Sequence, residues 1–388
     1  MSLRLGVLCS HPIQYNAPLF RELARHLDLH VYYGHRQTPA GQAAAGFGVG
    51  FEWDTDLFSG YSHEFLDNQA ADPGVDRFFG CDTPQIAGKI RDGHFDAFLV
   101  TGWYLKSYWQ AIRACRRLGV PVMVRGDSRL GTSRGRLKRL IKRLLYPRVL
   151  RQFDACLYVG QESREYFAHY GVDESRLFFS PHCVDNDWFA AQAARESKSG
   201  ARWELGLSDD ASGVLLFVGK LIDIKRPMDL VKAAAVLRGS GHALRLVYVG
   251  DGPLRAGIEA LARELAVPAT FLGFRNQSEL PIIFKAADIL VLPSESETWG
   301  LSVNEAMACG VPAVVADSVG CARDLVPPGA VYAVGNVAAM ASTLLASLLD
   351  PQPSGALVEK MAEYSVPMAA RGIVDAARQR QPARELTA

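Results

Sequence analysis

Short apolar runs that alternate with longer helix-period stretches constrain the fold of this chain more than any other feature. Each run ends at Gly, Ser, Asp or Pro, and most runs are apolar on both alternations. Strands of that kind are buried on both faces, as in parallel sheets covered by helices. The runs are 4–10, 28–34, 97–102, 120–126, 155–160, 177–182, 213–219, 244–250, 269–274, 289–294, 312–320 and 330–335.

This alternation predicts an α/β protein with two doubly wound domains, and 388 residues provide enough chain for both. The polar stretch 190–213 contains no strand candidate, so we expect the boundary near residue 190, with domains at 1–190 and 191–365 and a tail at 366–388. Segment 35–82 is long and rich in Gly, Asp and aromatic residues. It fits either a substrate-facing insertion or a packing lid.

The composition indicates an ordinary globular protein that does not coat nucleic acid, since 49% of residues are hydrophobic, 21% are charged and the net charge is +1. The seven cysteines are scattered and form no C-x-x-C pair, which favours reduced thiols and a cytoplasmic location. The first apolar run stops at Ser10-His11-Pro12, too early for a signal peptide, and no segment reaches the roughly 20 residues of a membrane span. We therefore expect any membrane contact to be peripheral.

Polar residues directly follow several strand candidates. Open parallel sheets bind ligands just beyond the carboxyl ends of their strands, so these residues are candidates for a site. Glu297 and Gly300 follow run 289–294, and a helix is predicted from about Ser302 with Glu305 in its first turn. A helix N-terminus can hold a phosphate, and a glycine lets the backbone approach it. We expect Glu305 to be stabilised by that terminus and to bind a diol such as ribose, while Glu297 reaches hydroxyl groups beyond the phosphates. Two ordinary surface carboxylates are the alternative.

Lys220 and Lys225 follow run 213–219 and could neutralise a diphosphate whose charge grows as its bond to a sugar breaks. Solvated loop lysines are the alternative interpretation. We identify no Asp-x-Asp motif on a strand end and no His/Asp cluster at metal-ligand spacing, so we expect organic cations and no metal or other cofactor. The stretch GDGPLRAGI, 250–258, superficially resembles a dinucleotide-binding loop but lacks the third glycine at the required spacing, which disfavours a nicotinamide enzyme.

The second half of the chain resembles the retaining glycosyltransferases of family 4, which have the GT-B fold. The similar segments, in the family's order, are Gly219-Lys220 with Lys225, VYVGDGPLR, FLGFRNQSEL, and ADILVLPS followed by Glu297, Glu305 and EAMACGVPAVVADSVG. The resemblance implies a UDP- or GDP-linked sugar as co-substrate. It also implies a tail that returns to the first domain as a helix.

The resemblance assigns roles to individual residues. Lys220 and Lys225 would bind the diphosphate, Glu305 the ribose, Glu297 the donor sugar, and the backbone near Arg275 the base. The remaining donor-binding residues would be Gly219, Gly300, Leu301 and Ser302. Lys220 stands where an arginine is more frequent, which exchanges a bidentate phosphate contact for a point charge.

The first domain resembles the family less. Asp127 occupies the position of the family's catalytic-site histidine, and His11 follows the first strand. We take both as catalytic candidates beside Glu297, with turn-capping roles as the alternatives. His182 and Cys183 replace the family's usual Asn and Gly, and a structural role is favoured for His182.

The stretch 133–153 contains eight Lys and Arg residues, no acidic residue, and leucines at helical spacing. Such a helix fits peripheral contact with an anionic membrane. A buried apolar stripe with solvated cations is favoured, because each helix of an α/β domain needs a buried face.

The expected function is metal-independent, retaining transfer of a sugar from a nucleotide donor to a hydroxyl of a glycan or lipid-linked acceptor, in glycan or glycolipid assembly. A GT-B epimerase and a non-catalytic binding or membrane-docking module are the alternatives. We expect no nucleic-acid partner.

Overall fold

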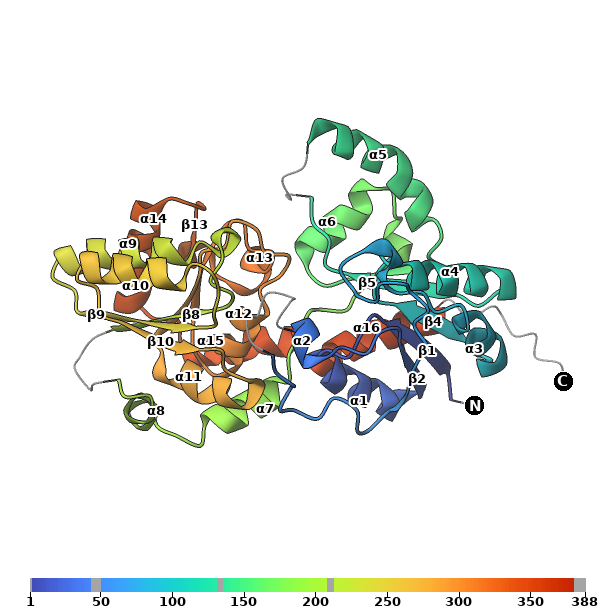
Figure 1. Ribbon diagram of the computed structural model, residues 1–388, viewed down its shortest axis with the longest axis horizontal. Helices are drawn as coiled ribbons and strands as arrows, with labels where there is room; N and C mark the ends of the chain where they lie inside the picture. The colour runs from blue at the N-terminus through green and yellow to red at the C-terminus, as the bar shows by residue number, and fades with distance from the viewer. Residues whose placement is uncertain (1, 43–49, 131–134, 208–212, 380–388) are drawn as a thin grey trace. The chain divides into compact units, whose positions relative to one another are not determined.

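The computed structural model describes residues 2–42, 50–130, 135–207 and 213–379 (Figure 1). The chain divides into two compact units. The first unit contains 1–37, 56–182 and 366–388, and the second contains 38–55 and 183–365. Each unit is therefore assembled from separate stretches of sequence.

The first unit is built on a parallel sheet of seven strands in the order β3-β2-β1-β4-β5-β6-β7. Its strands are β1 (Arg4–Cys9), β2 (Asp28–Tyr33), β3 (Ser62–Phe65), β4 (Ala97–Val100), β5 (Val122–Gly126), β6 (Ala155–Tyr158) and β7 (Leu177–Phe179). Its helices are α1 (Asn16–His26), α3 (Ile86–Gly93), α4 (Lys106–Leu118), α5 (Arg136–Leu150), α6 (Gln161–His169) and α16 (Val366–Gln379).

The second unit is built on a parallel sheet of six strands in the order β10-β9-β8-β11-β12-β13. Its strands are β8 (Gly213–Val218), β9 (Leu244–Val249), β10 (Ala269–Gly273), β11 (Ile289–Leu292), β12 (Ala313–Ala316) and β13 (Val331–Tyr332). Its helices are α2 (Pro39–Gln42), α7 (Asn186–Ala193), α8 (Lys198–Glu204), α9 (Pro227–Gly239), α10 (Arg255–Glu264), α11 (Leu280–Ala286), α12 (Leu301–Ala308), α13 (Ala322–Leu325), α14 (Val337–Leu349) and α15 (Ser354–Glu363).

The predicted α/β class with two parallel sheets is confirmed, and every strand candidate contains a strand. Strand β3 was not predicted, because three of the four residues in Ser-His-Glu-Phe are polar and the strand lies at the edge of the first sheet. In each sheet the strand order reverses at one point, between β1 and β4 and between β8 and β11. Parallel sheets leave a crevice at such a switch point, so these two positions are where ligands are expected.

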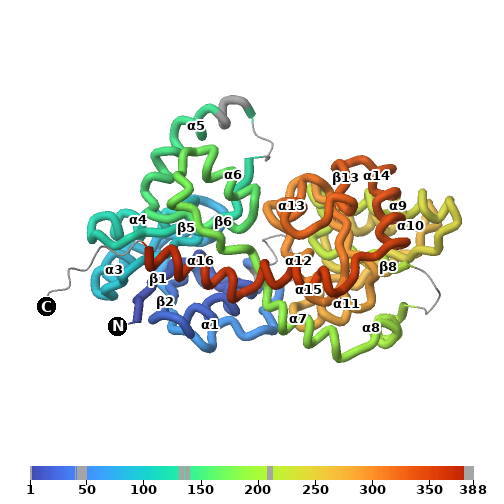
Figure 2. The backbone as a smooth tube through the Cα atoms, turned by 180° about the vertical axis from the view of Figure 1, so that it is seen from behind, coloured from blue at the N-terminus to red at the C-terminus, as the bar shows by residue number. Residues whose placement is uncertain are grey.

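Helix α16 belongs to the first unit although it is last in the chain (Figure 2). It packs against α1 and β7, and the Ser180 hydroxyl donates a hydrogen bond of 3.0 Å to the Ala369 carbonyl. A Cβ at Gly372 would lie 1.8 Å from the carbonyl oxygen of Phe179. Only glycine permits this approach of helix to strand end.

Helix α5 contradicts the favoured interpretation of stretch 133–153. Its apolar stripe faces solvent, because Leu140, Ile141, Leu144 and Leu145 are between 45% and 58% exposed. The helix is attached through its other face, where Tyr146 contacts the rings of Tyr166 and Tyr170 on the α6 side. In both Figures 1 and 2, α5 lies at the edge of the first unit with α6 on its inner side.

Candidate functional site

The loops that follow β8 and β11 meet at the switch point of the second sheet. The backbone N–H of Glu295 donates to the Ile224 carbonyl at 2.8 Å. Directly beside this contact, the Lys225 ammonium forms an ion pair with the Glu297 carboxylate, and both side chains are about one-fifth exposed. The structure thus brings together two of the residues that the sequence analysis selected.

Lys220 lies on the same loop as Lys225 and is half-buried. Burial, and then the charge of Lys225, lower the pKa of Lys220 below its ordinary value. An anion bound near the two ammonium groups would favour the charged form of Lys220 and so oppose both the burial and the charge of Lys225. The loop is tightly held, because a Cβ at Gly250, after β9, would lie 2.0 Å from the Gly219 carbonyl oxygen. The glycines of the Gly-Asp-Gly stretch therefore allow two loops to approach closely.

Glu305 differs from its prediction in position and electrostatics. Helix α12 begins at Leu301, so Glu305 lies in the second turn and does not face the orphan N–H groups of the first. Its side chain is buried, and burial raises the pKa of Glu305 to about 7. Gln277, in the short 3-10 helix η5 (Gln277–Glu279), lies 3.4 Å from its carboxylate. The prediction that the N-terminus of the helix stabilises the charged form of Glu305 is therefore wrong.

The raised pKa of Glu305 predicts a pH-dependent stability. The folded protein binds the Glu305 proton more tightly than the unfolded chain does. The contribution of this group to the free energy of unfolding is therefore fully present below pH 4.5 and is lost as the pH rises to about 7. The loss amounts to about 3 kcal/mol. Glu305→Gln is expected to match the wild type near pH 5 and to unfold at a higher temperature near pH 8, measured by thermal denaturation. The exposed Glu264→Gln is the control, and an equal difference at both pH values would contradict the prediction.

Gly300 and Arg275 flank this assembly. Gly300 has a φ of 107°, which only glycine adopts easily, and it leads into α12 at Leu301 and Ser302. The Arg275 guanidinium donates to Glu279 at 2.8 Å and to the Leu272 carbonyl at 3.1 Å. Its side chain thus braces the loop after β10, whose backbone is the predicted base contact.

A piece of segment 35–82 docks on that same loop. The ring of Phe51 lies 4.3 Å from that of Phe274, and the Asn276 side chain donates to the Glu52 carbonyl at 2.7 Å. Asp54 accepts from the backbone N–H of Ser278. This part of the segment therefore belongs to the second unit, while residues 43–49 lie outside the described residues.

The loop after β12 holds the backbone around Glu297. Gly320 N–H donates to the Glu297 carbonyl at 3.0 Å and Cys321 N–H donates to the Trp299 carbonyl at 2.9 Å. A Cβ at Gly320 would lie 2.0 Å from the Thr298 carbonyl oxygen. Sequence reasoning missed these positioning contacts and that of Gln277. The glycine of the Ser-Val-Gly stretch was the available signal for this loop.

The first unit has a pocket of about 200 Å³ at the carboxyl ends of its strands, around the switch point between β1 and β4. It brings together His11, Asp127 and His182, from the ends of β1, β5 and β7. The other lining residues are Ser10, Ile13, Tyr15, Asn16, Thr101, Tyr104, Tyr108, Arg125, Gly126 and Val159. We call this the first-unit pocket.

Both imidazoles of the first-unit pocket favour the neutral form. Burial, and then the charge of His35, lower the pKa of His11 to about 4, and its Nδ1 lies 3.0 Å from the Ser10 hydroxyl. Burial also lowers the pKa of His182, whose Nε2 lies 3.8 Å from the Asp127 carboxylate. With a pKa of about 4, His11 is a weak proton acceptor, but its neutral ring can still accept a hydrogen bond. The pocket therefore contains two neutral imidazoles and a carboxylate.

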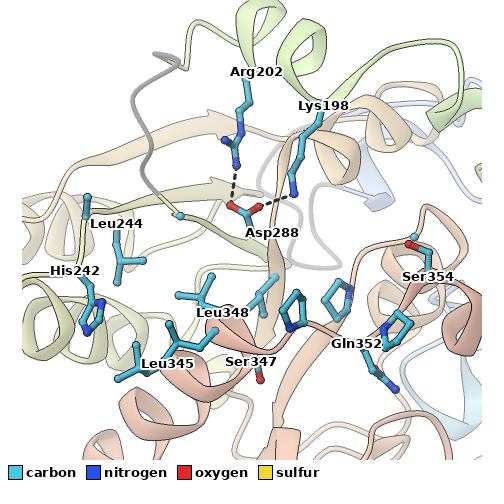
Figure 3. A pocket seen from close by; sticks show the side chains of 18 of the residues that line it. Lys198, Arg202, His242, Leu244, Asp288, Leu345, Ser347, Leu348, Gln352 and Ser354 are labelled. Atoms are coloured by element: carbon cyan, nitrogen blue, oxygen red, sulfur yellow. Dashed lines mark hydrogen bonds and ion pairs between the residues drawn. The ribbon is translucent and has the colours of Figure 1, made fainter.

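A second pocket, of about 750 Å³, lies at the amino ends of the strands of the second unit (Figure 3). Lys198 and Arg202 point at Asp288, which also accepts from the backbone N–H of Val214 at 2.7 Å. The two cations are thus committed to tying α8 to the sheet.

Among the described residues, no group of three His, Cys, Asp or Glu side chains is arranged to hold a metal ion. No helix in the described ranges has the length and apolar character needed to cross a membrane.

Residues 204–365 match the model of the family described as glycosyl transferases group 1. The chain is 38% identical over 182 residues to D-inositol 3-phosphate glycosyltransferase from Geodermatophilus obscurus, covering 44% of this chain and 39% of the relative. It is 35% identical over 191 residues to 2-deoxystreptamine glucosyltransferase from Streptomyces kanamyceticus, covering 48% and 49%. The chain thus matches less than half of the length of these curated relatives.

The whole fold has solved counterparts. The crystal structure of Anabaena HepE in complex with UDP superposes with a TM-score of 0.71 and 17% identity, covering 97% of this chain and 100% of that chain. At this identity the likeness shows the fold alone.

Proposed function

We propose that this chain, whose residues 204–365 match the group 1 glycosyltransferases and whose fold is that of solved GT-B structures, transfers a sugar from a nucleotide donor to an acceptor hydroxyl, with retention. The assembly at the β8–β11 switch point is the observation that supports the proposal most. It combines two ammonium groups with two carboxylates, the set that a diphosphate and two sugars require.

We assign the donor's diphosphate to Lys220 and Lys225, its ribose to Glu305, its sugar hydroxyls to Glu297, and its base to the backbone near Arg275. UDP is the first nucleotide to test, because HepE was solved with it. The bond between the sugar's anomeric carbon and the diphosphate breaks while the bond to the acceptor oxygen forms on the same face. The acceptor's proton passes to the leaving diphosphate oxygen. The lysines stabilise the charge that develops there.

The acceptor in this proposal is a glycan or lipid-linked hydroxyl compound that binds in the first-unit pocket. Neutral His11 and the Asp127 carboxylate are positioned in that pocket to orient a hydroxyl by hydrogen bonds. Because the lysines carry the compensating charge, turnover is proposed to need no divalent cation. Persistence of turnover in EDTA is the corresponding measurement.

A panel of UDP-, GDP- and CMP-linked sugars tests the function. We expect one donor to release free nucleotide, with a rate that rises when an acceptor is added. Release of nucleotide with an epimerised free sugar and no effect of acceptor would favour the epimerase. Saturable binding of donor with no turnover would favour a non-catalytic module.

We also propose that the protein is cytoplasmic and touches the inner face of an anionic membrane through α5. The exposed leucines of α5 offer apolar area, and Arg143, Arg148 and Arg151 are exposed beside them. Apolar insertion together with basic residues is the combination that binds anionic bilayers. The seven buried, free cysteines support a reducing compartment.

Flotation with phosphatidylcholine vesicles, with and without phosphatidylserine, tests the membrane contact. The wild type is expected to float only with the anionic vesicles and to be released by high salt. Leu144→Glu is expected to reduce recovery to background. Leu118→Glu, at another exposed leucine at the end of α4, is expected to leave recovery unchanged. Recovery of the wild type in the unbound fraction with anionic vesicles would reject the proposed membrane contact.

A further inference from the structure

Arg226 has an unusual backbone conformation within the β8–β11 assembly. It lies between the short 3-10 helix η4 (Asp223–Lys225) and α9, with a φ of 49° and a ψ of 43°. This left-handed region disfavours residues that have a Cβ, so such a residue stays there only where its surroundings hold it. Because Arg226 directly follows Lys225 in the chain, whatever holds Arg226 also affects the position of that lysine.

The Arg226 guanidinium joins three segments of the second unit. Its Nε donates at 2.7 Å to the carboxylate of Asp229, which lies in the first turn of α9 and is only 6% exposed. Its Nη1 donates at 3.4 Å to the carboxylate of Glu295, in the loop after β11. A Cβ at Gly335 would lie 3.2 Å from Nη2, so the loop after β13 also passes close to the guanidinium.

Glu295 contacts the loop after β8 on both sides of Lys225. Its backbone N–H donates to the Ile224 carbonyl at 2.8 Å, and its carboxylate accepts from Arg226. Lys225 lies between these two contacts in sequence, and its ion-pair partner Glu297 comes two residues after Glu295. Loss of the Arg226 side chain would remove the contact on the α9 side and let the lysine move away from Glu297.

We propose that Arg226 is a positioning residue of the donor site, which holds the loop after β8 so that Lys225 stays beside Glu297. The proposal rests on the proposed function, because it takes Lys225 as the contact for the donor's diphosphate. Arg226 acts through that lysine and does not need to touch the donor, since its guanidinium is engaged by two carboxylates. Charge-assisted hydrogen bonds of this kind are strong enough to fix the conformation of a loop.

The reactivity of Lys225 towards an acylating reagent tests the proposal without any nucleotide. Limited acetylation of the full chain, followed by mass spectrometry, gives a rate for each lysine, and the exposed Lys232 in α9 is the internal reference. In the wild type, partial burial limits access to the Lys225 amine, and the Glu297 carboxylate favours its charged, unreactive form.

Arg226→Gly suits the left-handed backbone but lacks the guanidinium. It is expected to raise the acetylation rate of Lys225 at least about threefold relative to Lys232. Arg226→Lys keeps a cation that can reach Asp229, and it is expected to raise the rate by less than about twofold. The matched control is Arg195→Gly, at an exposed arginine in the turn after α7, which is expected to leave the Lys225 rate unchanged.

An unchanged Lys225 rate in Arg226→Gly would overturn the proposal. If this variant fails to fold, Arg226→Gln decides in its place, because its uncharged amide can still donate to the buried Asp229 carboxylate. A rise of about twofold or more is expected for Arg226→Gln, and no rise would overturn the proposal.

UDP titrations separate positioning from a general loss of stability. Arg226→Gly is expected to weaken UDP binding about tenfold in the wild-type background and less than about twofold in the Lys225→Ala background, because the effect passes through Lys225. An equal loss in both backgrounds would show that Arg226 acts by another route and would overturn the proposal.

The two measurements also separate this proposal from the proposed function. If the wild type binds no nucleotide while Lys225 becomes reactive in Arg226→Gly, the proposed function is rejected and the positioning role is supported. Nucleotide binding and turnover by the wild type, without any change of Lys225 reactivity in the variant, would reject the positioning role alone.

Discussion

Lys225→Ala is expected to weaken UDP binding by about a hundredfold. The substitution removes one of two cations beside the proposed diphosphate, and it also leaves Glu297, which is mostly buried, without the cation that it contacts in the structure. Truncating one partner of such a charge pair costs roughly 2 to 5 kcal/mol. Calorimetric titration with UDP measures the effect, and Lys232→Ala on the exposed side of α9 is the control.

Glu297→Gln is expected to act in the opposite way on binding. Because it releases Lys225, UDP affinity should stay equal or increase, whereas turnover should fall by about a hundredfold or more through lost contact with the reacting sugar. The double variant should bind UDP about tenfold more tightly than Lys225→Ala alone. If Lys225→Ala binds UDP within about threefold of the wild type, this lysine does not contact the phosphates.

Gly372→Ala is expected to destabilise the first unit by about 3 kcal/mol, since the new methyl group would overlap the Phe179 carbonyl oxygen and push α16 away from β7. Gly88→Ala, in α3 of the same unit, is expected to stabilise it by about 0.5 kcal/mol, because no atom lies closer than 3.8 Å to the added Cβ and alanine favours a helix. Thermal unfolding measures both. Equal melting temperatures for the two variants would contradict the close packing of α16.

The fold was predictable because its signal is local. In the part of the chain that the structure describes, twelve of the thirteen strands lie in runs that are mostly apolar on both alternations, and such runs can be recognised without knowing their partners. Strand β3 could not be found in this way, because one sheet neighbour and a solvent-exposed edge impose no apolar pattern on Ser-His-Glu-Phe.

The candidate site was predictable only in its position. Strand ends indicated Lys220, Lys225 and Glu297, and the loops after β8 and β11 do meet. The environment of Glu305 was not predictable, because its burial depends on where α12 begins and on Gln277, 28 residues away in sequence. The orientation of α5 was missed for a similar reason. Its leucines have the spacing of a core stripe, yet the residues that anchor it are Tyr146 and Leu150.

The position of α16 has a consequence for how the polypeptide acquires its structure during synthesis. The helix that packs against α1 and β7 follows the second unit in the sequence. During synthesis the sheet of the first unit therefore has this face uncovered until α16 has left the ribosome, and a nascent chain stopped before residue 366 exposes apolar surface. Neither unit is one contiguous segment of the sequence, so neither can be produced by itself as a single uninterrupted piece of the chain.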